Sequence, residues 1–421
     1  MQAAWKNKNL QLYFGGQLVS LIGTWMQQMA LSWLIYRMTN STFMLGLIGF
    51  TSQVPSLLFT PFAGLLADKA NRHRLILITQ SLAMVQATLL SLLVWHGQAQ
   101  LWQLLSLSAF LGIITAFDMP ARQSFLVDML DDSEQLASAI GVNSSINTLT
   151  RLIGPFVAGI FVAWAGEALC FVVNALSYVA VIVALLFVKS RQKAKTGLQK
   201  GALSQLKEGF DYTKNSKPIR DLIMLLALIG LFAMPFGVLM PAFAKDVFHG
   251  NAFTLGLLSG ASAAGSLVGA LYLTSLKGTA ALSKAIIAGC ASCGLALILF
   301  GFCTYLPLSL LAVAVVGFGS MMVMAGSNTV IQTIVDEDKR GRVMSFVIMA
   351  FLGLGPFGCM VAGAMANSIG AGKTATVTGV LTLILAIVFA SRILRIHLHV
   401  TGAQVQEGLN EAEAELVLEK I

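Results

Sequence analysis

The sequence predicts an all-α membrane protein whose twelve transmembrane helices form two pseudo-symmetric six-helix bundles. Of its 421 residues, 57% are hydrophobic and only 11% are charged, and the mean hydropathy is +0.79. Soluble proteins carry about 25% charged residues, so this chain must bury apolar surface in lipid as well as in its own core. Its apolar runs are continuous over about 20 residues, which favours membrane helices over the alternating pattern of a β-barrel.

Twelve such runs occupy most of the chain. We expect the spans at residues 10–36, 43–67, 75–95, 101–119, 137–164, 168–188, 221–244, 253–276, 283–304, 306–330, 343–367 and 374–396. A single long hydrophilic segment interrupts them, and it is rich in Lys and Arg. The sequence therefore predicts an N-terminal bundle at 1–188, a cytoplasmic basic linker at 189–220, a C-terminal bundle at 221–396 and a cytoplasmic acidic tail at 397–421.

The basic residues lie almost entirely on one side of the predicted membrane. Of the 27 Lys and Arg residues, Arg37, Lys245 and Lys373 fall on the opposite side and Arg151 falls within a span, which leaves 27 − 3 − 1 = 23. Loops rich in Lys and Arg stay in the cytoplasm, so both termini are predicted to be cytoplasmic. This distribution, rather than a nucleic-acid partner, accounts for the net charge of +8.

Three features that elsewhere indicate chemistry are better explained structurally here. The five cysteines all lie in apolar runs and behave as small core residues. Gly372-Lys373-Thr374 lacks the first glycine of a phosphate-binding loop, because Asn367 holds that position. His397 and His399 lack a third metal ligand. With no cluster of acids, histidines or nucleophiles inside the spans, we predict neither an enzyme nor a bound metal or cofactor.

The fifth predicted span carries a charge at its centre. Asn143, Asn147 and Arg151 recur every four residues and share one helix face. A guanidinium near the bilayer centre costs about 2.5–3.5 kcal/mol on insertion scales, so this face must avoid lipid. Two interpretations remain open at this point. Arg151 is either buried and satisfied by backbone carbonyls and asparagines, or it lines a cavity and meets a substrate.

Other polar side chains interrupt apolar spans in the same way. They are Gln27 and Gln28 in the first span, and Asn328 and Gln332, four residues apart, at the end of the tenth. Such groups either line a central cavity or join helices to each other through hydrogen bonds. We take them, with Arg151, Asn143 and Asn147, as candidate cavity residues.

The two halves repeat short sequences at corresponding places. The second span opens on Phe43-x-Leu45-Gly46-Leu47 and the eighth on Phe253-x-Leu255-Gly256-Leu257. The fifth contains Gly154-Pro155-Phe156 and the eleventh Gly355-Pro356-Phe357. Paired interruptions of this kind are typical of transporters that arose by duplication.

The loop after the second span has a recognisable motif. Residues 64–74, GLLADKANRHR, resemble the loop signature of the major facilitator superfamily at its glycine, leucine, aspartate and basic positions: Gly64, Asp68, Lys69, Arg72 and Arg74. Asn71 replaces a glycine, and Asn is the residue that best tolerates positive φ after glycine. Asp68 at a helix C-terminus opposes the helix dipole, so it requires a cation or another helix N-terminus. We expect Arg72, Arg74 or the start of the eleventh span to provide it and to gate the cytoplasmic side.

The central stretch of the fifth span matches a second motif. Gly141, Thr150, Gly154, Pro155 and Gly159 resemble the antiporter motif of the same superfamily, with Thr150 in place of a glycine. Finer matches, such as Ala116 to Gln123 and Arg340 to Val343, are similar to the transmembrane secretion effector branch, which includes the enterobactin exporter. The resemblance covers residues 10 to about 396 and leaves out the linker and tail.

The resemblance implies a secondary active exporter in the inner membrane that works by alternating access, is coupled to protons by antiport and acts as a monomer. Its expected substrate is a small organic anion similar to a siderophore, with multidrug efflux or lipid and lysolipid flipping as alternatives. Thr24 stands where some relatives have an aspartate. No carboxylate falls in the middle of a predicted span, and Asp118 is placed near a cytoplasmic end, so the sequence does not identify a proton carrier.

Overall fold

The structure, a computed structural model, describes residues 8–130, 133–188, 202–337 and 339–396. Within these residues, twelve helical stretches are long and apolar enough to cross a membrane. The acidic tail, with His397 and His399, and residues 189–201 of the basic linker lie outside the described residues. Helices of the first half are α1 (Lys8–Thr39), α2 (Thr42–Lys69), α3 (Arg72–Trp95), α4 (Leu101–Asp128), α5 (Ser133–Ala165) and α6 (Glu167–Phe187).

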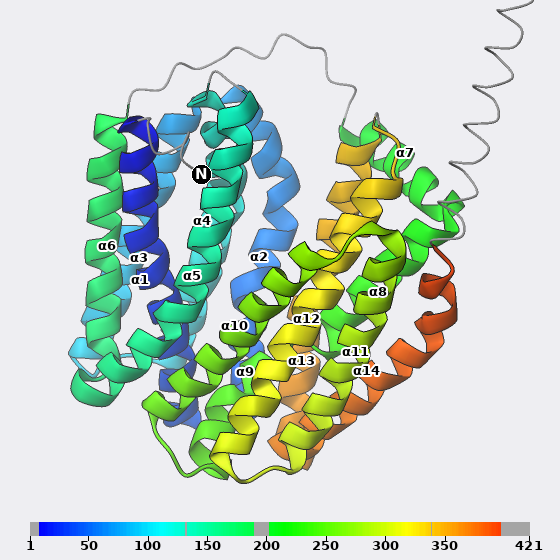
Figure 1. Ribbon diagram of the computed structural model, residues 1–421. Coiled ribbons are helices and arrows are strands. Elements are labelled where there is room, and N and C mark those ends of the chain that lie inside the picture. Colours follow the sequence, from blue (N-terminus) through cyan, green and yellow to red (C-terminus); the bar gives the residue numbers. More distant parts are fainter. Residues whose placement is uncertain (1–7, 131–132, 189–201, 338, 397–421) are drawn as a thin grey trace, which may run out of the picture.

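The second half follows a short helix of the linker, α7 (Ala202–Asn215). Its elements are α8 (Lys217–Phe232), α9 (Phe236–Ala242), a π-helical turn η2 (Phe243–Val247), α10 (Ala252–Ser275), α11 (Gly278–Phe302), α12 (Leu306–Ile334), α13 (Arg340–Ile369) and α14 (Ala371–Leu394). Helices α1–α6 pack together on one side of the molecule and α8–α14 on the other (Figure 1). This is the two-bundle architecture that the sequence predicts.

Local sequence signals explain several helix boundaries. The side chains of Ser41, Asn71 and Asn251 accept hydrogen bonds from backbone N–H groups in the first turns of α2, α3 and α10, which would otherwise lack partners. Gly166 and Gly370 adopt φ of 82° and 89° in the tight turns before α6 and α14. Glycine permits this left-handed conformation because it has no Cβ.

Two spans differ from the prediction. The fourth, expected to end at residue 119, continues as α4 through Pro120 to Asp128. The seventh, expected as one helix at 221–244, breaks after Phe232, resumes at Phe236 and finishes in the π-helical turn. Proline lacks a backbone donor, and here Pro235 and Pro241 fall at and just after the break. Hydropathy reports burial in lipid and does not distinguish a broken helix from a straight one.

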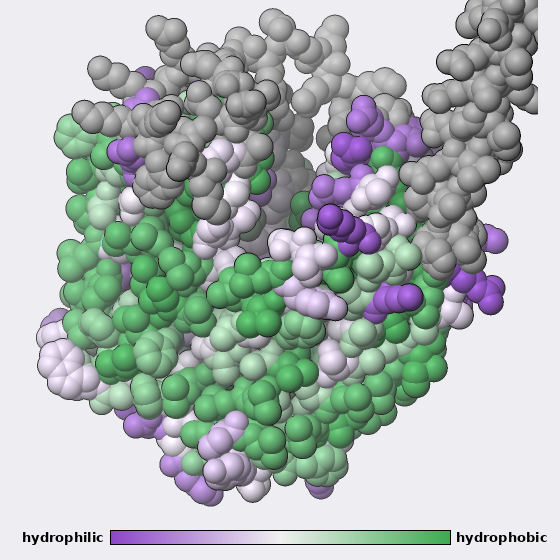
Figure 2. All heavy atoms as spheres, in the orientation of Figure 1, coloured by the Kyte–Doolittle hydropathy of each residue, from purple (hydrophilic) through white to green (hydrophobic). Residues whose placement is uncertain are grey.

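The outer surface is apolar over the middle of the molecule and polar at both ends (Figure 2). Large hydrophobic side chains on it are widely exposed, among them Leu186, Phe187, Val268, Leu271 and Ile387. Lipid tails would cover this belt in a membrane. The same view shows a notch at the top, between the two halves and on the side of α7. We call that end of the bundle the linker face.

Candidate functional site

The two halves meet most closely at the end of the bundle opposite the linker face, which we call the closed face. There α2 packs on α13 and α5 packs on α10, through glycines. A Cβ atom added to Gly46 would lie 2.5 Å from the carbonyl oxygen of Cys359 and 3.0 Å from the Cα of Gly363. One added to Gly256 would lie 3.0 Å from the carbonyl oxygen of Pro155 and 3.1 Å from the Cα of Gly159. Glycine is therefore required for these helix crossings.

The glycine contacts repeat in the two halves, but not in the register that the sequence suggests. Gly46 touches residues 359 and 363, and Gly256 touches residues 155 and 159, in each case four residues apart. Cys359 thus takes the place of Pro155, whereas the sequence match pairs Pro155 with Pro356. The two Gly-Pro interruptions differ by about one helical turn relative to the contacts they support.

Polar contacts also join the halves at the closed face. The Tyr36 hydroxyl of α1 donates a hydrogen bond to the Asp246 carboxylate of η2. Lys245 Nζ donates to Asn40 Oδ1 at 2.5 Å. On the other pair of helices, Thr42 Oγ1 donates to the Gly363 carbonyl at 3.1 Å. These contacts close this end of the space between the halves.

Contact between α2 and α13 weakens toward the linker face. A Cβ at Gly353 would meet only Leu57, at 3.6 Å. Beyond that point Leu58, Phe62 and Leu66 of α2 are 59%, 66% and 44% exposed. Together with the notch in Figure 2, this places the opening of the central space at the linker face.

Arg151 lies on α5 next to the contacts that join this helix to α10 and α1. It is one turn from Pro155, where α5 touches α10, and three residues from Gly154, where α5 touches α1. Its side chain is exposed and its guanidinium carbon lies 5.8 Å from the centre of the Trp25 ring. Among the described residues, no carboxylate forms an ion pair with it. An exposed cation without an acidic partner is consistent with the second interpretation, and contact of Arg151 with a substrate stays a prediction.

The other polar residues of α5 are partly committed to the protein. Asn143 Oδ1 accepts a hydrogen bond from Gln17 Nε2 of α1 at 3.2 Å. The Asn147 side chain is exposed, and its amide donates to the Asn143 backbone carbonyl at 2.8 Å. The helix face that these residues share is therefore exposed at Asn147 and Arg151, while Asn143 joins α5 to α1.

The two candidate glutamines of α1 lie in different environments. Gln28 is exposed. Gln27 is only 1% exposed and lies inside the N-terminal bundle, where it donates to Gln86 Oε1 at 3.0 Å and accepts from Asn174 Nδ2 at 2.8 Å. The structure thus places Gln27 between helices rather than on the central space. A spacing of one residue on a helix turns the side chain by about 100°, which decides between the two environments.

The two candidate cavity residues on α12 differ in their exposure. Asn328 is half-buried and Gln332 is exposed. Within the part of the chain that the structure describes, neither forms a hydrogen bond with the α5 residues.

The antiporter motif supports helix packing. Gly154 has the Trp25 Cβ 2.4 Å from where its own Cβ would be, and Gly159 makes the contact with α10. Thr150 is fully buried and its hydroxyl donates to the Ile146 carbonyl of its own helix. Gly141 has open space around its Cα. The motif therefore holds α5 against α1 on one side and α10 on the other.

The loop motif of residues 64–74 differs from the prediction at Asn71. Asn71 has φ of −69° and caps α3 by accepting from the Arg74 backbone N–H at 3.1 Å, so it needs no positive φ. Arg72 is buried; its Nη1 lies 2.6 Å from Asp128 Oδ1 and its Nε donates to the Ala67 carbonyl. Gly64 has open space around it and Arg74 is exposed. The side chains of Asp68 and Lys69 lie outside the described residues.

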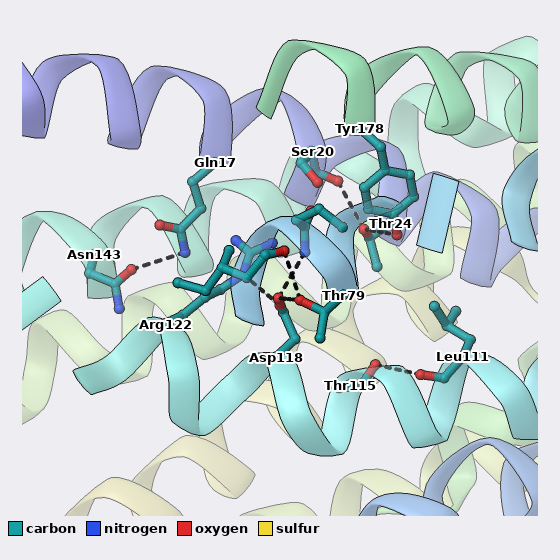
Figure 3. Close-up of polar contacts among 12 residues, drawn as sticks. Gln17, Ser20, Thr24, Thr79, Leu111, Thr115, Asp118, Arg122, Asn143 and Tyr178 are labelled. Carbon is teal, nitrogen blue, oxygen red and sulfur yellow. Dashed lines mark hydrogen bonds and ion pairs between the residues drawn. The ribbon is translucent and has the colours of Figure 1, made fainter. Parts of the chain in front are cut away.

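One buried cluster was missed by the sequence reasoning. Because α4 continues to Asp128, Asp118 lies about 15 Å inside the helix rather than at its end. Its Oδ2 is 2.5 Å from Arg122 Nε, and its Oδ1 accepts from Thr79 Oγ1 at 2.7 Å and Gln80 Nε2 at 2.9 Å (Figure 3). The Asp118 and Arg122 side chains are 15% and 13% exposed. Their spacing of four residues in an apolar run was the available signal.

Further hydroxyl groups border this pair. Tyr13 of α1 and Tyr178 of α6 are buried close enough to interact electrostatically with both charges. Tyr178 also shares a hydrogen bond of 3.3 Å with Thr24 Oγ1. Arg122, which the predicted span boundary assigns to a loop, is thus a cation inside the bundle.

The comparisons with known proteins agree with this architecture. A family model described as transmembrane secretion effector matches residues 3–420. The chain belongs to the transmembrane secretion effector family. It is accordingly a multi-pass efflux transporter of the major facilitator superfamily and not an enzyme.

Curated relatives of this family member match over most of their length. The staphyloferrin A transporter of Staphylococcus aureus is 26% identical, with 90% of this chain and 94% of the relative covered. Macrolide efflux protein A of Streptococcus pyogenes is 24% identical, at 91% and 95% coverage. Multidrug efflux pump Tap of Mycobacterium tuberculosis is 26% identical, at 84% and 86%.

Solved structures share the fold at low identity. The nucleoside transporter NupG superposes with a TM-score of 0.75 at 13% identity and covers 91% of this chain and 98% of its own. A bacterial homologue of the human lysosomal transporter Spinster, in an inward-facing conformation, gives 0.73 at 15% identity, with 93% and 98% covered.

Proposed function

We propose that this protein exports a small organic anion from the cytoplasm by alternating access, with Arg151 as the residue that holds the anion. The observation that carries the proposal is an exposed guanidinium one helical turn from the contact of α5 with α10 at Pro155, without an acidic partner among the described residues. A cation at such depth favours a negatively charged ligand, since the surroundings screen it less than bulk water does.

The substrate class we favour is a siderophore-like anion with carboxylate or catecholate groups. Arg presents donors in a planar fork that matches a pair of oxygens with two parallel hydrogen bonds. A relative that transports staphyloferrin A supports this choice. To test this, the small molecules released into the medium are compared between intact cells with and without the protein. We expect an anionic metabolite to be missing from the medium of the cells that lack the protein. Release of only neutral compounds, or of a lipid, would contradict it.

Multidrug efflux is the second candidate. The relatives that are macrolide and multidrug efflux pumps favour it, as do the exposed apolar side chains of Leu58, Phe59, Phe62 and Leu66 on α2. In that case cells without the protein become sensitive to amphipathic drugs, and Arg151 has little effect on their export. The two candidates therefore differ in their dependence on one residue.

We assign proton coupling to Asp118. It is the carboxylate held inside the N-terminal bundle by Arg122, Thr79 and Gln80, and embedded acids are the usual proton carriers in transporters. Thr24, where some relatives have an aspartate, borders the same cluster through Tyr178. Proton binding at Asp118 would release Arg122 and so change the packing of α1, α3, α4 and α6.

Asp118→Asn is expected to abolish substrate-dependent proton movement. The measurement is the change in a pH gradient across inverted membrane vesicles when citrate or 2,3-dihydroxybenzoate is added. Leaving Arg122 buried without its partner costs about 3–5 kcal/mol, so the matched variant Asp118→Asn with Arg122→Gln restores the charge balance. Proton movement at the wild-type rate in the double variant would exclude Asp118 as the carrier.

The direction of export depends on which face is cytoplasmic. Lys214 is exposed on α7 at the linker face and Lys373 is exposed at the start of α14 on the other side. We expect a cysteine at position 373, but not one at 214, to react in intact cells with a thiol reagent that cannot cross membranes. The reverse pattern would overturn the orientation and, with it, the proposal of export.

A further inference from the structure

Two sequence motifs that are far apart along the chain meet beside Arg151. Trp25 belongs to α1 and lies within the segment Gly23 to Gln27, whereas Arg151 and Gly154 belong to the antiporter motif of α5. Arg151 and Gly154 are three residues apart, so they share one face of α5. Both contact the same tryptophan.

Gly154 sets the position of the Trp25 backbone. A Cβ at residue 154 would lie 2.4 Å from the Trp25 Cβ, 3.3 Å from the Ile22 carbonyl oxygen and 3.4 Å from the Trp25 Cγ. These distances leave no room for a side chain. The missing Cβ allows α1 and α5 to approach until the Trp25 ring reaches the next turn of α5, where Arg151 lies.

Trp25 in turn supports the Arg151 side chain. The guanidinium carbon lies over the ring, 5.8 Å from its centre, and the ring is only half-buried. A guanidinium over an aromatic face is held by attraction to the electron-rich ring. Among the described residues no hydrogen bond or ion pair engages the guanidinium N–H groups of Arg151, so they can donate to a ligand.

We propose that Trp25 is a specificity-determining residue, which fixes the Arg151 guanidinium so that it prefers anions that present two oxygens side by side, such as carboxylates and catecholates, over a single-atom anion such as chloride. Gly154 acts through Trp25 as a positioning residue. This inference rests on the proposed function, since it describes how the anion site distinguishes its ligands.

The test measures binding by the purified protein of three probes: 2,3-dihydroxybenzoate, citrate and chloride. In the wild type we expect the two organic anions to bind at least about tenfold more tightly than chloride, since one bidentate pair exceeds one point contact. Trp25→Leu is expected to weaken organic-anion binding about tenfold and to reduce the preference over chloride. Trp25→Phe keeps an aromatic face and should retain most of the affinity for the organic anions and most of the preference for them.

Gly154→Ala provides a second variant, in which Trp25 and Arg151 are not themselves substituted. It should reduce the preference in the same direction as Trp25→Leu, because its Cβ displaces the ring. Thermal unfolding without probes shows whether each variant is folded. A general loss of structure would weaken all three probes equally, whereas loss of the proposed support changes the ratio between them.

The outcomes distinguish this inference from the proposed function. If Arg151→Ala abolishes binding but Trp25→Leu keeps the wild-type affinities and preference, the role of Trp25 is wrong and the anion site stands. If the wild type binds none of the probes, or Arg151→Ala binds them as the wild type does, the anion site itself is wrong, and the role of Trp25 fails with it.

Discussion

Arg151→Ala is expected to reduce export at least about 100-fold, because it removes two charge-assisted hydrogen bonds worth about 1.5–3 kcal/mol each. The protein should still fold. Arg151 is exposed and has no acidic partner among the described residues, so its removal leaves no buried charge behind. Arg151→Lys keeps the charge without the planar fork and should reduce export less, by about tenfold.

The measurement is uptake of the released metabolite, or of labelled citrate, into inverted membrane vesicles that contain equal amounts of each variant. Lys373→Ala is the matched control, since Lys373 is an exposed cation near the closed face and away from the central space. Export by Arg151→Ala at the wild-type rate would show that this residue is structural. The proposal of an anionic substrate would then lose its basis.

The pair Gly46→Leu and Gly256→Leu is expected to open the closed face and stop transport. Even a Cβ at these positions would press on the backbone of Cys359 or Pro155 across the two halves. Overpacking of this kind costs about 1–3 kcal/mol per site, and a total of about 3 kcal/mol changes a conformational equilibrium about 100-fold. The separated state should therefore become the major one.

Cys359 reports this change directly, because its side chain lies between α2 and α13 and is 5% exposed. In a Cys303→Ser background, we expect the double variant to react with a maleimide at Cys359 at least about tenfold faster than the wild type. The other cysteines, Cys170, Cys290 and Cys293, are buried inside their own halves.

Gly260→Leu is the matched control for this experiment. Gly260 lies one turn from Gly256 on α10 but has open space around its Cα. It should leave the reactivity of Cys359 unchanged. Equal reactivity in the double variant, together with normal transport, would show that the glycine contacts are not a gate.

Hydropathy predicted most of the fold because apolar length is what the bilayer selects. Ten of the spans lie within a few residues of the observed helices, and the errors have identifiable causes. Pro120 looks like a helix end, yet its missing donor is tolerated and α4 continues to Asp128. Misplacing that end put Asp118 near the end of its span and Arg122 outside it, which concealed the buried pair that they form.

The candidate site was predicted less completely than the fold. Arg151 was identified because a charge in an apolar run is costly wherever the helix lies. Gln27 and Gln28 are equally polar in the sequence, and only the packing of α1 against α3 and α6 sends Gln27 into the bundle. Asn71 illustrates the same limit, since its role as a cap depends on where α3 begins.

The amino-acid sequence by itself determined that this chain crosses a membrane twelve times, that its halves are related, and that one cation lies deep in the fifth span. Those features follow from local composition and spacing, which burial in lipid constrains strongly. Tertiary structure decided which face of each helix meets the other half, that Trp25 and Gly154 surround Arg151, and that the central space closes at Gly46 and Gly256. These contacts join residues more than one hundred positions apart, and their geometry depends on helix rotation and register, which composition and spacing do not specify.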